Sequence, residues 1–327
     1  MTPALTAAGR SDEDGTGSPM LVARSNPESP CHLIRQECKN MTVTLRNYRG
    51  AEDIHLQSVF WMQATRGLPW CWKPTISPLL YSQGAQFDPR SRCFAFDGDR
   101  LVGYMSFTGQ GKFVSLGYPW VLPGHEGELQ EELYDTVYGF AASPEYGGRM
   151  FAQRFREPWT DQISFFERHE FVVQRRDPLY VLDLRAITIS QIRVTCQVEC
   201  AARFCWDDFH ELSAGHLPAE QLSMWKQYFQ TVDFDFAVRA QRNGMAVACM
   251  GIAIRPDTGF AEMIAVAVEP AALDVLASCL GAAAAQSRSR KARYLGTKAI
   301  RLNGSDEVLA QLGFKKASEE LLLSKSI

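Results

Sequence analysis

Long apolar runs and a hydrophobic amino-terminal stretch are both missing from this sequence of 327 residues. Its longest apolar runs, residues 264–268 and 273–285, fall short of the roughly 20 apolar residues that span a bilayer, and Asp274 interrupts the second. Acidic residues at 12–14 interrupt the place where a secretory signal would need its hydrophobic stretch. We therefore expect no membrane contact and a cytoplasmic location.

A strong net charge and an even set of cysteines are missing as well. The formal net charge is −3, so no general attraction to nucleic acid or anionic lipid is expected, and any site for a polyanion must be local. The nine cysteines are scattered through core-like stretches, which is typical of reduced thiols that pack as small apolar side chains. A disulfide framework is not expected.

The chain does contain enough apolar surface for two cores. Hydrophobic residues make up 46% and charged residues 22%, and 327 residues exceed what one core usually organises. Residues 1–40 are rich in Ser, Gly, Pro, Asp and Glu without periodicity, and we expect them to be a disordered tail. Folded structure is expected to start at Met41, with an alternating strand at 41–46 and an amphipathic helix at 51–62.

Two turn signals of the same kind indicate β-hairpins in the two halves of the chain. Asp97-Gly98 joins one pair of alternating apolar runs and Asn243-Gly244 joins another. Each hairpin is followed by a further strand and then by a helical stretch, at residues 128–142 and 271–285. The same order of elements is therefore predicted twice.

Three landmarks recur at a nearly constant offset along the chain, which predicts an internal duplication with a joint near residues 184–192. The two copies would be residues 41–185 and 192–327, each an α/β unit with a mixed sheet and flanking helices. The landmark pairs are Gly98 and Gly244, 146 residues apart, Pro123 and Pro270, 147 apart, and Phe171 and Phe314, 143 apart.

The carboxyl end of each copy is a short helix that runs into a closing strand. In the second copy, Leu312-Gly313-Phe314 leads into the predicted strand at 320–325. This ending, and the layout before it, resemble the acyl-CoA N-acyltransferase (GNAT) superfamily in a tandem layout like that of mycothiol synthase. The resemblance implies two tandem GNAT-like domains and an N-acyltransferase that moves an acyl group from a thioester donor to a small-molecule amine.

The resemblance also implies where the donor binds. In the family, acyl-CoA lies where the fourth strand splays from the fifth, and its pyrophosphate rests on the start of the next helix. Acetyl-CoA or another acyl-CoA is therefore the expected cosubstrate. In the second copy the implied contacts are the strand residues Ala265, Val266, Ala267 and Val268, with Arg288 and Arg290 of a basic run as phosphate ligands.

Both copies depart from the family's phosphate loop, Arg/Gln-x-x-Gly-x-Gly/Ala. The first copy has Glu126 at the Arg/Gln position and Glu128 two residues later, where carboxylates would repel a pyrophosphate. The stretch after Val268 has neither the glycines nor the arginine. The family's usual tyrosine acid is replaced by Phe166 and Leu309, neither of which protonates a thiolate.

Several residues are candidates for catalysis, each with a structural alternative. Glu262, on the predicted fourth strand of the second copy, would deprotonate the amine, or it is an exposed strand carboxylate. His125 and Glu126 would act as acid or base, or they belong to an ordinary acidic helix start. Trp70 and Trp72 lie where family members wall the acceptor pocket, but we expect them to fill a core.

A metal is not expected, because Cys196, Cys200, Cys205 and His210 have spacings that fit no standard zinc site. The basic run that contains Arg288 and Arg290 has a solvated helix end as its alternative interpretation.

Two alternatives stay open beside transfer from acyl-CoA. One is an enzyme of this fold with another donor, such as an aminoacyl-tRNA or a carrier-protein thioester, which the altered loop favours. The other is a binding module that has lost catalysis. The expected partners are therefore a small-molecule amine and, in the first alternative, a carrier protein or tRNA.

Overall fold

The structure is a computed structural model that describes residues 43–73, 82–83, 87–110, 112–186, 197–298, 300 and 303–327. All of these residues fall in one compact unit, Thr42–Ile327. The predicted tail and most of the predicted joint lie outside the described residues. Within the described part of the chain, no helix has the length and apolar character needed to cross a membrane.

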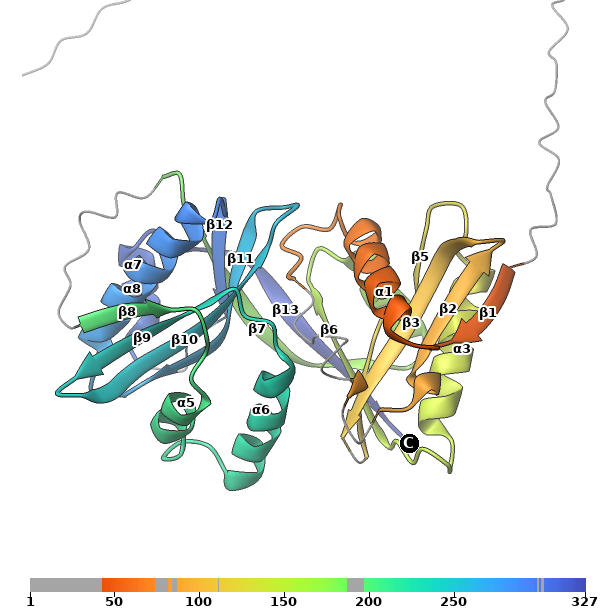
Figure 1. Cartoon of the computed structure of the whole chain (residues 1–327), viewed down its shortest axis with the longest axis horizontal. Helices are drawn as coiled ribbons and strands as arrows, with labels where there is room; N and C mark the ends of the chain where they lie inside the picture. The colour runs from red at the N-terminus through yellow and green to blue at the C-terminus, as the bar shows by residue number, and fades with distance from the viewer. Residues whose placement is uncertain are drawn as a thin grey trace, which may run out of the picture. The chain divides into compact units, whose positions relative to one another are not determined.

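One mixed sheet of 13 strands organises the described residues, so the predicted fold class is confirmed (Figure 1). The strand order is β1-β2-β3-β4-β6-β13-β7-β12-β11-β10-β9-β8, and β5 pairs with β3 only. In the first half the strands are β1 (Val43–Asn47), β2 (Arg92–Asp97), β3 (Arg100–Gln110), β4 (Phe113–Leu116), β5 (Trp120–Val121), β6 (Met150–Arg156) and β7 (Val172–Asp183). In the second half they are β8 (Gln197–Ala201), β9 (Phe236–Arg242), β10 (Met245–Arg255), β11 (Phe260–Val268), β12 (Tyr294–Lys298) and β13 (Lys315–Ser326).

Both predicted hairpins are present. β2 and β3 pair antiparallel around Asp97 and Gly98, and β9 and β10 pair antiparallel around Asn243 and Gly244. Asn243 and Gly244 have φ angles of 55° and 80°, as a two-residue turn of the type that matches the strand twist requires. Local turn chemistry therefore sets the register of the second hairpin.

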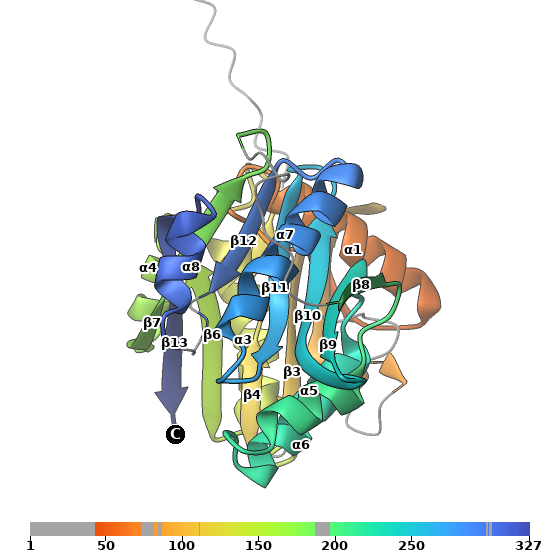
Figure 2. The ribbon, with the colours of Figure 1, turned by 90° about the vertical axis from the view of Figure 1, so that its left-hand side faces the viewer.

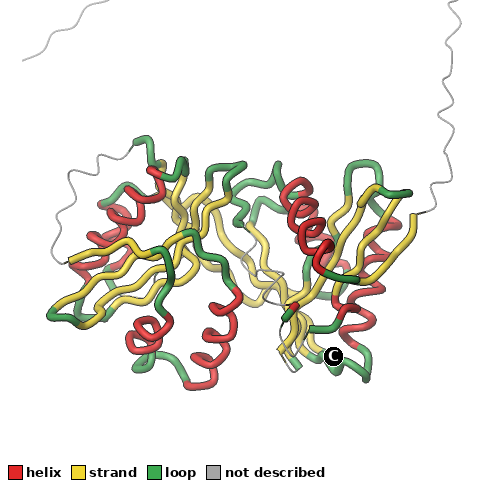
Figure 3. The backbone as a smooth tube through the Cα atoms, in the orientation of Figure 1, coloured by secondary structure: helices red, strands yellow, loops and turns green. Residues whose placement is uncertain are grey.

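Helices cover both faces of the sheet, as the red and yellow segments of Figure 3 show. In the first half, α1 lies in front of β3 and α3 behind it (Figure 1). In the second half, α5 and α6 lie on one face of β10, and α7 lies on the other. The helices are α1 (Ala51–Ala64), α3 (Glu128–Ala142), α4 (Thr160–Arg168), α5 (Trp206–Ser213), α6 (Ala219–Thr231), α7 (Leu273–Ser289) and α8 (Ser305–Gln311), with a 3₁₀ turn at Pro89–Ser91.

The last strands of the two halves exchange places at the centre of the sheet. β13 from the second half lies between β6 and β7 of the first, and β7 in turn pairs with β12 of the second half (Figure 2). β13 of the second half therefore pairs with strands of the first half, and β7 of the first half pairs with strands of the second. Although the repeat was predicted from the sequence, this exchange was not.

The β7–β13 pairing relates equivalent positions of the two copies. Glu320 lies opposite Asp177 in the register, and it follows Asp177 by 143 residues, the offset that also separates Phe171 from Phe314. A strand that meets its own copy at the equivalent residue is the pattern of a two-fold relationship. The duplication is thus visible in the tertiary structure as well as in the sequence.

Candidate active site

A gap opens in the first half where β4 ends. β4 pairs in parallel with β6 only from Phe113 opposite Met150 to Ser115 opposite Ala152. Residues 117–119 then interrupt the strand, and the chain resumes as β5, which pairs with β3 instead of β6. β6 continues to Arg156 with β13 on its other side. The two neighbouring strands therefore part beyond Ser115.

Gly117 allows the chain to make this interruption. A Cβ atom at this position would lie 2.7 Å from the main-chain oxygen of Ser106, closer than side chains approach backbone atoms. The amide of Gly117 donates to that same oxygen. Close contact with β3 at one residue thus fixes the point at which β4 leaves β6.

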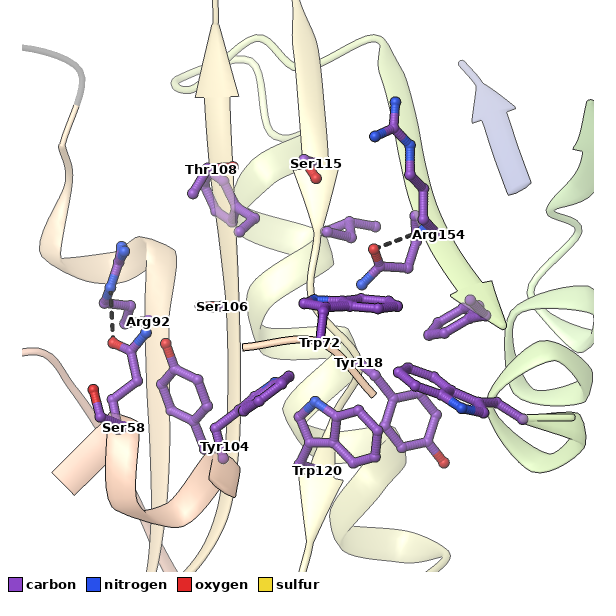
Figure 4. A pocket seen from close by; sticks show the side chains of 18 residues that line it. Ser58, Trp72, Arg92, Tyr104, Ser106, Thr108, Ser115, Tyr118, Trp120 and Arg154 are labelled. Carbon is purple, nitrogen blue, oxygen red and sulfur yellow. Dashed lines mark hydrogen bonds between the residues drawn. The ribbon is translucent and has the colours of Figure 1, made fainter. Parts of the chain in front are cut away.

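A cavity of about 190 Å³ occupies the parting of the strands (Figure 4). Side chains from α1, β3, the interruption after β4, and β6 line it. β3 contributes Tyr104, Ser106 and Thr108, which alternate along the strand and therefore share the face toward α1. On the opposite wall are Gln153 and Arg154 of β6.

Aromatic rings form much of the cavity wall. Trp72 stacks on Trp159 with ring centroids 4.8 Å apart, and the indole N–H of Trp159 donates to the carbonyl of Pro69 at 2.8 Å. Trp70 packs against Phe260 in a small apolar cluster with Leu179 and Val181, as expected for a core residue, whereas Trp72 lines the cavity, which was the alternative for the pair. Trp70 has a φ of 54°, so the chain is not extended there and residues two apart do not share a side as they would in a strand.

Tyr118 lies in the interruption itself and connects the cavity to the start of α3. Its hydroxyl accepts a hydrogen bond of 2.8 Å from the amide group of Gln130, whose oxygen accepts from the N–H of Gly127 at 3.3 Å. Burial raises the pKa of Tyr118, and the bond from Gln130 lowers it in part. Because the oxygen accepts from Gln130, the phenol keeps its own hydrogen for another partner.

Tyr104 is a second phenol in the cavity wall. It is 3% exposed, and its hydroxyl has no hydrogen bond of good geometry with any described residue. Burial raises its pKa to about 12, and the nearby Arg92 and Ser106 offset this only in part. The group stays protonated at neutral pH, so it is a hydrogen-bond donor that faces the cavity.

His125 and Glu126 lie on the turn before α3, and neither belongs to the described lining of this cavity. The Glu126 carboxylate accepts from the N–H of Gly124 at 2.7 Å. Gly124 and Gly127 have φ angles of 90° and 83°. The glycines therefore shape a loop with amides available to an anion, but a carboxylate of the protein already occupies one of them.

Glu262 is buried in an ion-pair cluster between the two halves instead of standing exposed on its strand. Its carboxylate accepts from the Arg156 guanidinium at 2.6 Å, and Arg156 also donates to Glu320 at 2.9 Å. Glu320 in turn binds Lys298 at 2.7 Å. Glu262 thus joins β11 to β6 across the centre of the sheet.

The residues of the second half that were predicted to bind the acyl donor lie in two separate places. β11 pairs in parallel with β12 only as far as Met263 opposite Thr297, and the strand residues that follow continue beside β10 alone. This is the same parting that occurs in the first half. Ala265 and Ala267 are buried there under the aromatic residues of α5 and α6, while Val266 and Val268 pack toward α7.

Arg288 and Arg290 lie at the far end of α7 from this strand end. α7 has 17 residues, and a rise of 1.5 Å per residue makes it about 25 Å long. Arg290 donates to the carbonyl of Asp235 at 2.9 Å and lies over the ring of Phe236. The structure therefore does not bring these arginines together with Val268.

The cysteine and histidine cluster is not assembled among the described residues. Cys196 lies outside them, and Cys200 and Cys205 are exposed. Nowhere in the described ranges do three or more His, Cys, Asp or Glu side chains form a group that could hold a metal ion.

No protein-family model matches this sequence, and no curated protein matches it either. Solved structures do share its fold. A tandem GNAT protein from the clavulanic acid biosynthesis pathway is 13% identical, with a TM-score of 0.61 over 86% of this chain and 98% of that chain. A GCN5-related N-acetyltransferase from Sphaerobacter thermophilus is also 13% identical, with a TM-score of 0.53 over 87% and 95% of the two chains. The chain therefore has the tandem GNAT fold that its layout predicted.

Proposed function

We propose that this chain with a tandem GNAT fold is an N-acyltransferase that moves an acyl group from a thioester donor to a small-molecule amine. The observation that carries the proposal is the cavity at the parting of β4 and β6. Such a parting exposes strand amides that can pair with an extended ligand, here the thioester donor. The cavity beside the parting is the place we propose for the smaller amine. We therefore place the reaction in the first half.

The amine attacks the thioester carbonyl, a C–N bond forms, and the C–S bond breaks. The amide of Tyr118 takes no part in the ladders of β4 or β5, so it is available to polarise the carbonyl oxygen as charge develops. The Tyr118 phenol then gives its proton to the leaving thiolate, and the proton that the amine loses restores the phenol, so the net transfer is from amine to thiolate. It takes the role that Phe166 and Leu309 cannot perform at the family's usual position.

We do not propose Glu262 as the general base. It is 4% exposed, is bound to Arg156, and is not among the described residues that line the cavity. A general base must reach the amine directly or through one water. We propose instead that Glu262 holds the two halves together.

The donor we propose is acyl-CoA, because the proteins of similar structure include an N-acetyltransferase. A specific observation favours a second candidate, in which the donor is a carrier-protein thioester or an aminoacyl-tRNA. Glu126 occupies the amide of Gly124, and Glu128 adds a second carboxylate in the first turn of α3. Both would oppose a pyrophosphate at this loop.

Thermal unfolding with acetyl-CoA tests the proposal. A ligand that binds the folded state raises the unfolding temperature, so we expect a saturable increase for the wild type. Ser115→Leu, which fills the parting, should abolish the increase, while the exposed Phe113→Leu on the same strand should keep it. Transfer is then measured as free thiol released in the presence of amines. No stabilisation at millimolar acetyl-CoA and no thiol release with any amine would refute transfer from acyl-CoA.

A further inference from the structure

The cavity has room for one aromatic ring and its substituents. A buried apolar cavity of about 150 Å³ accepts benzene, and this one measures about 190 Å³. Its walls include the stacked pair Trp72 and Trp159 and the edge-to-face pair Tyr118 and Trp120, whose ring centroids are 4.6 Å apart. Flat aromatic walls favour a flat ligand, which stacks between them.

The charged side chains of the wall are both cations. Arg92 and Arg154 line the cavity, and its described lining contains no Asp, Glu or His. The Arg154 guanidinium lies 3.9 Å from Glu320, but Glu320 already binds Arg156 and Lys298 at shorter distances.

The cluster behind the wall has an excess of positive charge. It combines three cations with two carboxylates, and Arg154, with 43% of its side chain accessible, is the cation among them that lines the cavity. A ligand with a carboxylate is attracted to this wall, whereas an ammonium is repelled. The members of the cluster are Arg154, Arg156, Lys298, Glu262 and Glu320.

The buried hydroxyl of Tyr104 is a further polar group in the cavity wall. It faces the cavity without a described hydrogen-bond partner, and a buried donor left unsatisfied is costly. An acceptor atom of a bound ligand satisfies it.

The described lining of the cavity restricts the amine as well. With no carboxylate or imidazole among the described lining residues, the amine has to arrive unprotonated. An aromatic amine meets this condition, because its lone pair is delocalised into the ring and it is neutral at physiological pH. An aliphatic amine would arrive as an ammonium ion and face the guanidinium of Arg154.

We infer that the acceptor is an aromatic amine that carries a carboxylate, which Arg154 binds while the ring packs against the aromatic walls. The inference rests on the proposed function and names its substrate class. The reaction converts the amine and the thioester into an N-aryl amide and a free thiol, and the amine's proton leaves with the thiolate.

Binding and turnover are measured separately with four probes: 4-aminobenzoate, aniline, benzylamine and coenzyme A. We expect 4-aminobenzoate to bind in calorimetry without any donor and to be acetylated from acetyl-CoA. Aniline, which lacks the carboxylate, should bind at least tenfold more weakly, and benzylamine should not bind measurably. Binding of 4-aminobenzoate without thiol release would refute the proposed function while leaving the ligand class intact. Turnover of benzylamine in preference to 4-aminobenzoate would refute the ligand class while leaving acyl transfer intact.

Variants identify the group that holds the carboxylate. Arg154→Met should weaken 4-aminobenzoate about tenfold, the usual effect of losing a hydrogen bond to a charged group, and leave aniline unchanged. Arg175→Met on β7, outside the described lining, is the matched control and should change neither. If Arg154→Met instead weakens coenzyme A and spares 4-aminobenzoate, the arginine serves the phosphates of the donor and the inference is wrong.

Discussion

Arg156 on β6 donates a hydrogen bond of 2.6 Å to Glu262 on β11, and the two side chains are 0% and 5% exposed. They lie 106 residues apart in the chain and belong to different copies of the repeat. Removing one member of a buried ion pair leaves the other charge buried without a partner and without water. This contact therefore makes the stability of one half depend on the other.

Arg156→Met should lower the free energy of unfolding by about 3–5 kcal/mol, because the carboxylate of Glu262 then stays buried without a cation. Urea denaturation measures the loss. The double variant Arg156→Met/Glu262→Gln should recover part of it, since the uncompensated charge is gone. Arg175→Met, whose half-exposed pair with Asp177 contributes about 1 kcal/mol or less, is the control. An Arg156→Met protein as stable as the wild type would contradict the proposed role of the pair.

Stability should also depend on the titration of Glu320. Burial raises its pKa, but Lys298, Arg156 and Arg154 together hold it well below its usual range. A lowered folded-state pKa contributes stability above the unfolded value, about 4.3 for glutamate, and that contribution is lost as the pH falls below it.

The free energy of unfolding of the wild type should therefore fall more steeply below about pH 4.3 than that of Glu320→Gln, by at most about 1.4 kcal/mol per pH unit. Chemical denaturation at a series of pH values measures both slopes. Glu211→Gln, an exposed change on α5, should keep the wild-type slope. Equal slopes for Glu320→Gln and the wild type would exclude the effect.

The exchange of β7 and β13 predicts that neither half folds alone. A chain that ends at Phe314 lacks β13, and a fragment of residues 41–185 leaves one edge of β6 and both edges of β7 without their partners. Exposed strand edges of this kind favour aggregation. We expect both to lose cooperative thermal unfolding in circular dichroism, while a chain that starts at Met41 keeps it. A sharp unfolding transition for fragment 41–185 would show that the exchange is dispensable.

Glu126→Gln should strengthen binding of acetyl-CoA several-fold. The change removes one negative charge from the loop and weakens the contact that occupies the Gly124 amide, so both effects favour a pyrophosphate. Calorimetric titration compares it with Glu132→Gln, an exposed carboxylate further along α3. Unchanged affinity in Glu126→Gln would mean that the donor's phosphates lie elsewhere, which supports a different donor.

Tyr118→Phe should lower kcat about 100-fold with little change in KM, as expected when a general acid is lost. The ring is kept, so the unfolding temperature should fall only slightly. Tyr138→Phe on α3, whose ring stacks on Tyr134 away from the described cavity lining, is the control. An unaltered kcat would assign the proton to water instead.

The hydrogen-bonded chain from Gly127 through Gln130 to Tyr118 shows why the site was only partly predictable. Tyr118 was not among the predicted site residues, and its orientation depends on a glutamine 12 residues later. Glu262 was predicted as a base on an open strand. Its burial depends on Arg156, which no sequence pattern connects with it.

The sequence by itself determined the elements and their repetition. Turn residues such as Asn243 and Gly244, and apolar periods of two and of 3.6, act over a few residues, so the hairpins and the principal helices could be predicted from local patterns. The offset of about 145 residues then predicted the tandem layout.

Only the tertiary structure decided which strand pairs with which and where the cavity lies. β13 carries the same local pattern whether it pairs within its own half or between β6 and β7, because strand pairing depends on non-local contacts that periodicity does not encode. The same is true of the cavity, which exists because Gly117 approaches β3 and turns the chain away from β6.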